Sequence, residues 1–250
     1  NAGEFMFFIG HYIAEGHASK STVCLSTHIE ENWGREISNV AIKQAFGLDC
    51  IEKNYKGNTC YLLFYNNIIG KFLDRLCGKG SKNKKIHSIL QNATNYKEII
   101  RGIYYGDGTF SGKSYKFSTS SEKLANNIFN MCLKEDIFLI RDKNKLGVFR
   151  LTCISEHENR FYKKFNPFKY NQEVKNIIKR KTSYVLENEK YFYLPIKDIK
   201  KEKYCGKIYN ISVENNESYL IQGYATHNCI PAAEALFLGR SVIAPKSTGF

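Results

Sequence analysis

Two acidic residues, Glu15 and Asp107, stand out because each ends a short apolar segment and is followed directly by glycine. The segments are residues 7–16 and 99–108. Each carries small residues four positions apart ahead of its acid, namely Gly10 and Ala14 in the first and Gly102 and Gly106 in the second. Positions four apart share one helix face, and a face of small residues lets two helices approach almost backbone to backbone. The spacing therefore predicts two helices packed side by side.

Such pairing brings the two acids together at the helix ends. The C-terminus of a helix carries partial negative charge, which disfavours a carboxylate there. Neighbouring like charges either raise a pKa or attract a cation, and carboxylate oxygens suit Mg²⁺. We therefore expect Glu15 and Asp107 to be metal ligands near a pseudo-two-fold axis. We also expect the glycine after each acid to end its helix in the left-handed conformation.

The two segments resemble the paired LAGLIDADG motifs of homing endonucleases. The glycine, the alanine or glycine, the acid and the final glycine are in register, and the acids are 92 positions apart. The resemblance implies an α+β fold, a saddle in which αββαββα is repeated, over residues 1–165, with subdomains at about 1–95 and 96–165. It also implies that the two acids bind divalent metal and direct cleavage of both strands of DNA.

Local patterns give the same order of elements twice. The first half is predicted to contain a helix at 5–15, a strand at 19–26, a helix at 35–46, a hairpin at 49–65 and a helix at 66–76. The second half is predicted to contain a helix at 97–105, a strand at 115–119, a helix at 121–134 that is capped by Ser121, and strands near 137–141 and 147–154.

A basic, glycine-rich loop at residues 78–87 precedes the second motif. Its end, Lys84-Lys85-Ile86-His87, resembles the K-x-I-P block of the same family. The family lysine falls on Lys84, and the resemblance implies a catalytic role for it near the scissile phosphate. His87 stands where the family has proline. The alternative is that the loop is a solvated turn.

The composition favours a nucleic acid as partner. Lys and Arg number 37 against 24 Asp and Glu, for a net charge of +13. A basic protein attracts polyanions, so we expect double-stranded DNA to bind, with lysines of the strands following the phosphates. A basic surface that binds nothing is the alternative. We expect the protein to act as a monomer.

The cysteines and the apolar runs limit the class of protein. The eight cysteines contain no C-x-x-C pair, which favours reduced thiols in a cytoplasmic protein over a disulfide framework or a zinc site. No apolar run approaches the ~18 residues of a membrane span, so no membrane partner is expected.

A second chemistry is indicated by residues 190–228, which read as short strands ending in His227-Asn228, with Cys229 next. They resemble the C-terminal splicing region of inteins, an all-β Hint fold. The Asn228 side-chain amide would attack its own backbone carbonyl, form a succinimide and cut the chain. His227 would donate a proton, and the Cys229 thiolate would accept the upstream segment.

The intein resemblance has departures. Glu217 stands where the family often has histidine, and Asn210 where it often has aspartate; either departure would slow or re-route cyclisation. The N-terminal splicing block, with its first nucleophile, is not in the sequence. We therefore expect an N-terminally truncated intein that needs its missing N-terminal half to splice.

The remaining segments allow alternatives. Residues 166–189 are predicted to be a linker helix whose lysines are either a solvated face or a DNA contact. Residues 229–250 are expected to begin a C-extein, and they resemble a nucleotide-sugar-binding segment of GT-B glycosyltransferases, with Glu234 matching an acid of that family. Two other functions stay open: a degenerate, maturase-like scaffold that binds DNA without cutting, and a glycosyltransferase fragment carrying an insert.

Overall fold

The computed structural model describes residues 2–111, 114–166, 186–189 and 191–194, and short pieces of the C-terminal part. Those pieces are 198, 203, 205–207, 213, 218–221 and 224–227. The chain forms two compact units, Asn1–Tyr193 and Leu194–Phe250. Most of the expected linker helix, together with Asn228, Cys229 and the expected extein, lies outside the described residues.

The first half of the larger unit contains three helices and a four-stranded antiparallel sheet of order β1-β2-β4-β3. Its elements are α1 (Ala2–Glu15), β1 (Gly16–Ser19), β2 (Thr22–His28), α2 (Asn32–Phe46), β3 (Ile51–Asn54), β4 (Thr59–Tyr65) and α3 (Asn67–Cys77). A connector with η1 (Ser81–Asn83) and α4 (Ser88–Gln91) leads into the second half.

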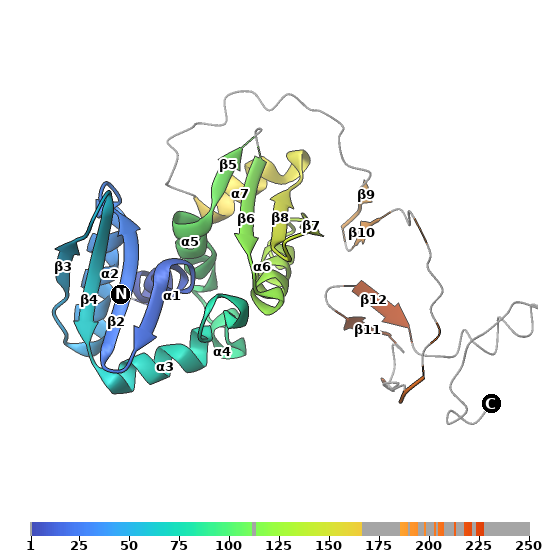
Figure 1. Ribbon diagram of the computed structural model, residues 1–250. Coiled ribbons are helices and arrows are strands. Elements are labelled where there is room, and N and C mark those ends of the chain that lie inside the picture. The colour runs from blue at the N-terminus through green and yellow to red at the C-terminus, as the bar shows by residue number, and fades with distance from the viewer. Residues whose placement is uncertain are drawn as a thin grey trace, which may run out of the picture. The chain divides into compact units, whose positions relative to one another are not determined.

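The second half repeats this order, with a sheet of order β5-β6-β8-β7. Its elements are α5 (Tyr96–Asp107), β5 (Thr109–Ser111), β6 (Ser114–Thr119), α6 (Glu122–Leu133), β7 (Leu139–Lys143), β8 (Phe149–Cys153), η2 (Ser155–His157) and α7 (Glu158–Phe165). Figure 1 shows α1 and α5 between the two sheets. The α+β fold with an αββαββα repeat is confirmed.

The first strand of each sheet was not predicted from local patterns. The strand expected at 19–26 corresponds to β2, which β1 precedes through a turn at Lys20 and Ser21. The strand expected at 115–119 corresponds to β6, which pairs antiparallel with β5. Lys20 has a φ of 51°. Because lysine rarely adopts this left-handed conformation, the sequence carries no turn signal there, and sheet pairing imposes the turn.

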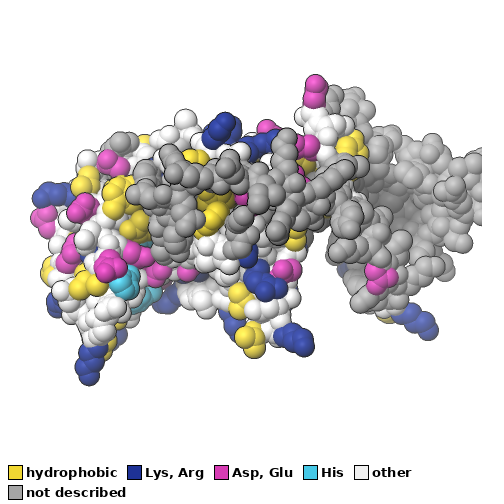
Figure 2. All heavy atoms as spheres, turned by 90° about the horizontal axis from the view of Figure 1, so that it is seen from above, with side chains coloured by type: hydrophobic (Ala, Val, Ile, Leu, Met, Phe, Trp, Pro, Cys, Tyr) yellow, Lys and Arg dark blue, Asp and Glu magenta, His cyan; other side chains and the backbone are white. Residues whose placement is uncertain are grey.

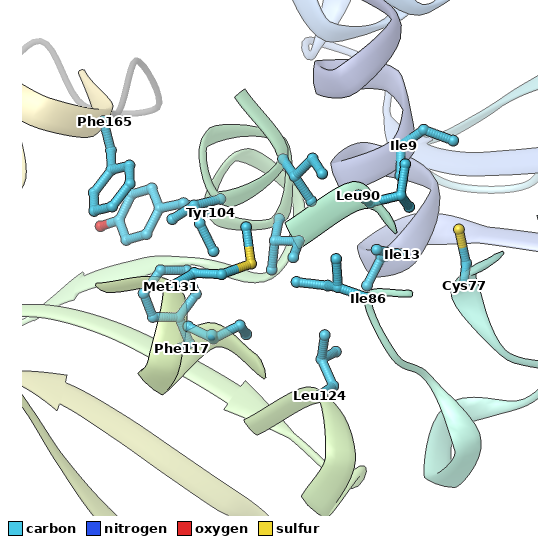
Figure 3. Close-up of a cluster of buried hydrophobic side chains, with 14 of the residues drawn as sticks. Ile9, Ile13, Cys77, Ile86, Leu90, Tyr104, Phe117, Leu124, Met131 and Phe165 are labelled. Carbon is cyan, nitrogen blue, oxygen red and sulfur yellow. The ribbon is translucent and has the colours of Figure 1, made fainter. Parts of the chain in front are cut away.

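The core is continuous across the two halves. In α1 every residue from 7 to 13 is buried, as expected of a helix with neighbours on all sides. Figure 3 shows Ile13 of α1, Ile86 of the connector and Leu124 of α6 in one cluster of buried side chains. The connector is therefore part of the interior and ties the halves together.

Further strands follow α7. A short hairpin of β9 (Leu186–Glu187) and β10 (Phe192–Tyr193) belongs to the larger unit. In the smaller unit, β11 (Ser218–Ile221) pairs antiparallel with β12 (Tyr224–His227). The assignment of residues 190–228 to an all-β splicing region stays a prediction. Among the described residues, no helix is long and apolar enough to cross a membrane.

Candidate active site

The two central helices touch through their backbones. A Cβ atom added to Gly10 would lie 2.1 Å from the carbonyl oxygen of Ile99, and one added to Gly102 would lie 2.2 Å from that of Phe7. No real side chain fits at such distances. The small residues are therefore required by the approach of α1 to α5, which confirms the packing predicted from their spacing.

This packing brings the two acidic helix ends together. A Cβ atom on Gly106 would lie 2.5 Å from the Cβ of Ala14 and 3.0 Å from the Cγ of Glu15. The Glu15 side chain thus lies over the residue that precedes Asp107. Glu15 is half-buried and Asp107 is exposed. The result is a pair of carboxylates at adjoining helix C-termini, where solvent and a ligand can reach them.

The glycines after the acids serve a different purpose from the one predicted. Gly108 has a φ of −74° and Gly16 has no positive φ, so neither is a left-handed helix end. Instead, a Cβ atom on Gly16 would lie 2.5 Å from the carbonyl oxygen of Tyr12, and one on Gly108 would lie 2.2 Å from that of Tyr104. Each chain turns so closely over the last helical turn that only glycine fits.

Lys84 lies beneath this site and is 9% exposed. Its Nζ donates hydrogen bonds to the carbonyl oxygens of Tyr12, at 3.0 Å, and Gly16, at 2.7 Å. Burial lowers the pKa of the ammonium, and the negative charge of Asp107 opposes that shift. A cation at the C-terminus of a helix complements its partial negative charge. These two bonds join the Lys84 ammonium to the last turn of α1 and to the first residue of β1. The role of Lys84 at a phosphate stays a prediction.

The solvent faces of the two sheets differ from the lysine-rich faces expected. In the first sheet, Ser26, Tyr61 and Lys53 lie in one row across β2, β4 and β3. In the second, Arg150 is paired with Asp142 at 2.7 Å. Figure 2 shows Lys and Arg scattered over the described part of the visible face, with Asp and Glu between them. The sequence gave no distinctive signal that hydroxyl and aromatic groups of the strands would lie on these faces.

Of the other predicted site residues, the structure describes His227. His227 is the last residue of β12, and in the sheet it is paired with Ser218 of β11. Asn228 and Cys229 lie outside the described residues. In the described part of the chain, no group of three or more His, Cys, Asp or Glu side chains is gathered that could hold a metal ion. A metal between α1 and α5 would therefore have two carboxylates from the protein.

No family model matches the chain. A relative in Methanocaldococcus jannaschii, an uncharacterized protein, is 23% identical over 266 residues, which is 91% of this chain and 28% of the relative. A DNA polymerase of Thermococcus aggregans is 25% identical over 87% of this chain and 14% of its own. An iron-sulfur cluster assembly SufBD family protein of Mycobacterium bovis is 25% identical over 90% of this chain and 27% of its own. The chain thus spans only about a seventh to a quarter of these relatives' lengths.

Solved structures resemble the larger unit. Mesophilic variants of the homing endonuclease I-DmoI give a TM-score of 0.55 at 11% identity, over 68% of this chain and 98% of theirs. I-DmoI in complex with DNA and Mn gives 0.53 at 12% identity, over 66% and 96%. The fold of this chain is that of the LAGLIDADG homing endonucleases.

Proposed function

We propose that the larger unit is a homing endonuclease, which makes a site-specific break in both strands of DNA. The observation that carries this proposal is the backbone contact between α1 and α5, because it places Glu15 beside Asp107 at one end of the helix pair. Two equivalent carboxylates on a pseudo-two-fold axis suit a substrate with two antiparallel strands. The similar fold of I-DmoI, described in complex with DNA and Mn, supports the proposal.

The residues present fit a divalent metal ion. Glu15 and Asp107 offer hard oxygen ligands, and both stand at the negative ends of helices, where a cation is favoured. Their ligand type suits Mg²⁺. A bound metal of this kind would activate water and stabilise charge on the phosphate. The protein's own part is to hold the two carboxylates together, and Lys84 contributes by holding the end of α1.

The DNA is proposed to lie along the solvent faces of the two sheets. Alternate residues of a strand point to one face, so the first sheet would present its row of Ser26, Tyr61 and Lys53 to a groove of the duplex. Two sheets in one chain would read a long site as a monomer. Binding without cutting is the outcome expected of a degenerate scaffold.

A plasmid tests the proposed nuclease. The plasmid carries the host gene without the sequence that encodes this protein, so that the codons on either side of the insertion point are joined. It is incubated with the protein in Mg²⁺ or in EDTA. We expect one linear product in Mg²⁺ that maps to the junction, and none in EDTA, because the carboxylates need a cation to act on a phosphodiester. A product of equal yield in EDTA would contradict a metal-dependent site.

A second function is favoured by the relatives. The names of two relatives, a DNA polymerase and an iron-sulfur cluster assembly protein, describe unrelated activities. Each nevertheless matches about nine-tenths of this chain with a small part of its own length. A segment common to such different proteins is best explained as an inserted element. We infer that the chain is an intein, with residues 190–228 as its C-terminal splicing region.

This inference predicts autocatalytic cleavage after Asn228. Cyclisation of its amide, with His227 as proton donor, would release residues 229–250, which begin with the nucleophile Cys229. Intact mass spectrometry of the incubated full chain should show this loss, whereas the Asn228→Ala variant should keep its full mass. If parent and variant keep the same length after incubation, Asn228 does not cyclise in this chain.

A further inference from the structure

The active-site end of α1 is connected to the second half of the molecule by a chain of buried hydrogen bonds. The Nζ of Lys84 donates to the carbonyl oxygens of Tyr12 and Gly16, which bracket Glu15 in the sequence. The Lys84 carbonyl oxygen in turn accepts a hydrogen bond of 2.6 Å from the hydroxyl of Ser121. Ser121 is fully buried.

The Ser121 hydroxyl makes two hydrogen bonds at once. Its oxygen accepts from the backbone N–H of Leu124, at 3.2 Å, and so caps the N-terminus of α6. Its O–H donates across to Lys84, 37 positions earlier in the chain. A hydroxyl can do both because it has one donor and two acceptor positions. The cap was predicted from the sequence, and the donated bond was not.

The segment that carries Lys84 is held firmly. The backbone N–H of Ile86 donates to the side chain of Asn127 of α6, at 3.0 Å, and Ile86 itself is buried. The backbone N–H of Lys85 donates to the carbonyl oxygen of Cys77 in α3. Because the Lys84 backbone is fixed to both halves, its ammonium is a rigid support for the end of α1.

We propose that Ser121 is a positioning residue of the nuclease site: it fixes Lys84, and Lys84 fixes the turn of α1 that carries Glu15. The proposal rests on the proposed nuclease function. Ser121 does not touch the substrate, and neither of its hydrogen bonds involves an acidic residue of the site. Its effect is transmitted through the Lys84 backbone to the Lys84 ammonium, and from there to two carbonyl groups.

The test compares three variants of the full chain. Ser121→Ala removes both the cap and the donated bond, whereas Ser121→Thr keeps a hydroxyl that can make both. Asn66→Ala is the matched control: Asn66 caps α3 by accepting from the backbone N–H groups of Ile68 and Ile69, at 3.0 and 3.1 Å. Its loss removes a helix cap without touching the Lys84 segment.

Two readouts are measured at a temperature well below the melting point of every variant. In Ser121→Ala we expect faster amide hydrogen exchange over residues 12–19, and a kcat for plasmid cutting lower by about tenfold with DNA affinity unchanged, because a small misplacement of a reacting group has large effects on rate. Ser121→Thr should restore both values. Asn66→Ala should match the parent in both.

The outcomes separate the two proposals. If the parent cuts and Ser121→Ala behaves like Asn66→Ala in either readout, the positioning role is overturned while the nuclease stands. If Ser121→Thr fails to restore cutting although it folds and exchanges like the parent, the role is also overturned. If the parent does not cut in Mg²⁺, the nuclease proposal falls, and unchanged exchange over residues 12–19 in Ser121→Ala would independently reject the link to α1.

Discussion

Replacing Asp107 with Asn is expected to abolish double-strand cutting while leaving DNA binding intact. The change keeps the size of the side chain and removes its charge. A ligand that helps a metal stabilise phosphate charge contributes roughly 4 kcal/mol, which corresponds to about a thousandfold in rate. Because Asp107 is an exposed group at the end of α5, its loss should not disturb the core. Glu15→Gln should have the same effect, since the two acids occupy equivalent positions in α1 and α5.

Asp49→Asn is the matched control for this prediction. Asp49 is exposed, lies between α2 and β3, and pairs with Lys43 at 2.7 Å on the surface. Exposed ion pairs contribute about 0–1 kcal/mol, so this variant should cut as the parent does. Cutting rates are measured in the plasmid assay, and DNA affinity is measured by gel shift in Ca²⁺. An Asp107→Asn protein that cuts at the parent's rate would show that the metal site has been assigned to the wrong residue.

Replacing Gly102 with Ala is expected to destabilise the larger unit strongly. The added methyl group would lie 2.2 Å from the carbonyl oxygen of Phe7 and 2.7 Å from the backbone nitrogen of His11. Both atoms belong to the backbone of α1, so the helices must separate. Overpacking of this kind lowers the free energy of unfolding by about 3 kcal/mol, which outweighs the ~1 kcal/mol that alanine gains over glycine in a helix.

Gly70→Ala is the control for that variant. Gly70 is also inside a helix, α3, but a Cβ atom there would lie 3.4 Å from Ala18 and 3.5 Å from Val23, which is ordinary contact. This variant should equal the parent in stability or exceed it slightly. Guanidinium unfolding can be followed by Trp33, the one tryptophan, whose ring lies 5.0 Å from that of Phe7. Equal stability of the two variants would contradict the close contact of α1 and α5.

Most elements could be predicted from the sequence because their signals are local. The periodicity of residues 35–46 and the turn around Gly57 correspond to α2 and to the β3–β4 hairpin within a few residues. The cap at Ser121 was predicted for the same reason. The strand β1 was missed because Lys20 gives no turn signal, and its conformation is imposed by pairing with β2.

For the candidate site, the sequence by itself determined the two acids and the helix pair, because the small residues and acids recur at one spacing in both halves. Only the tertiary structure decided what surrounds them. The glycines after the acids are explained by the nearness of Tyr12 and Tyr104, since neither glycine is left-handed. The Lys84 ammonium donates hydrogen bonds to carbonyl groups that lie 72 and 68 positions earlier in the chain. Contacts over such separations depend on the packing of whole elements, which no local pattern of residues records.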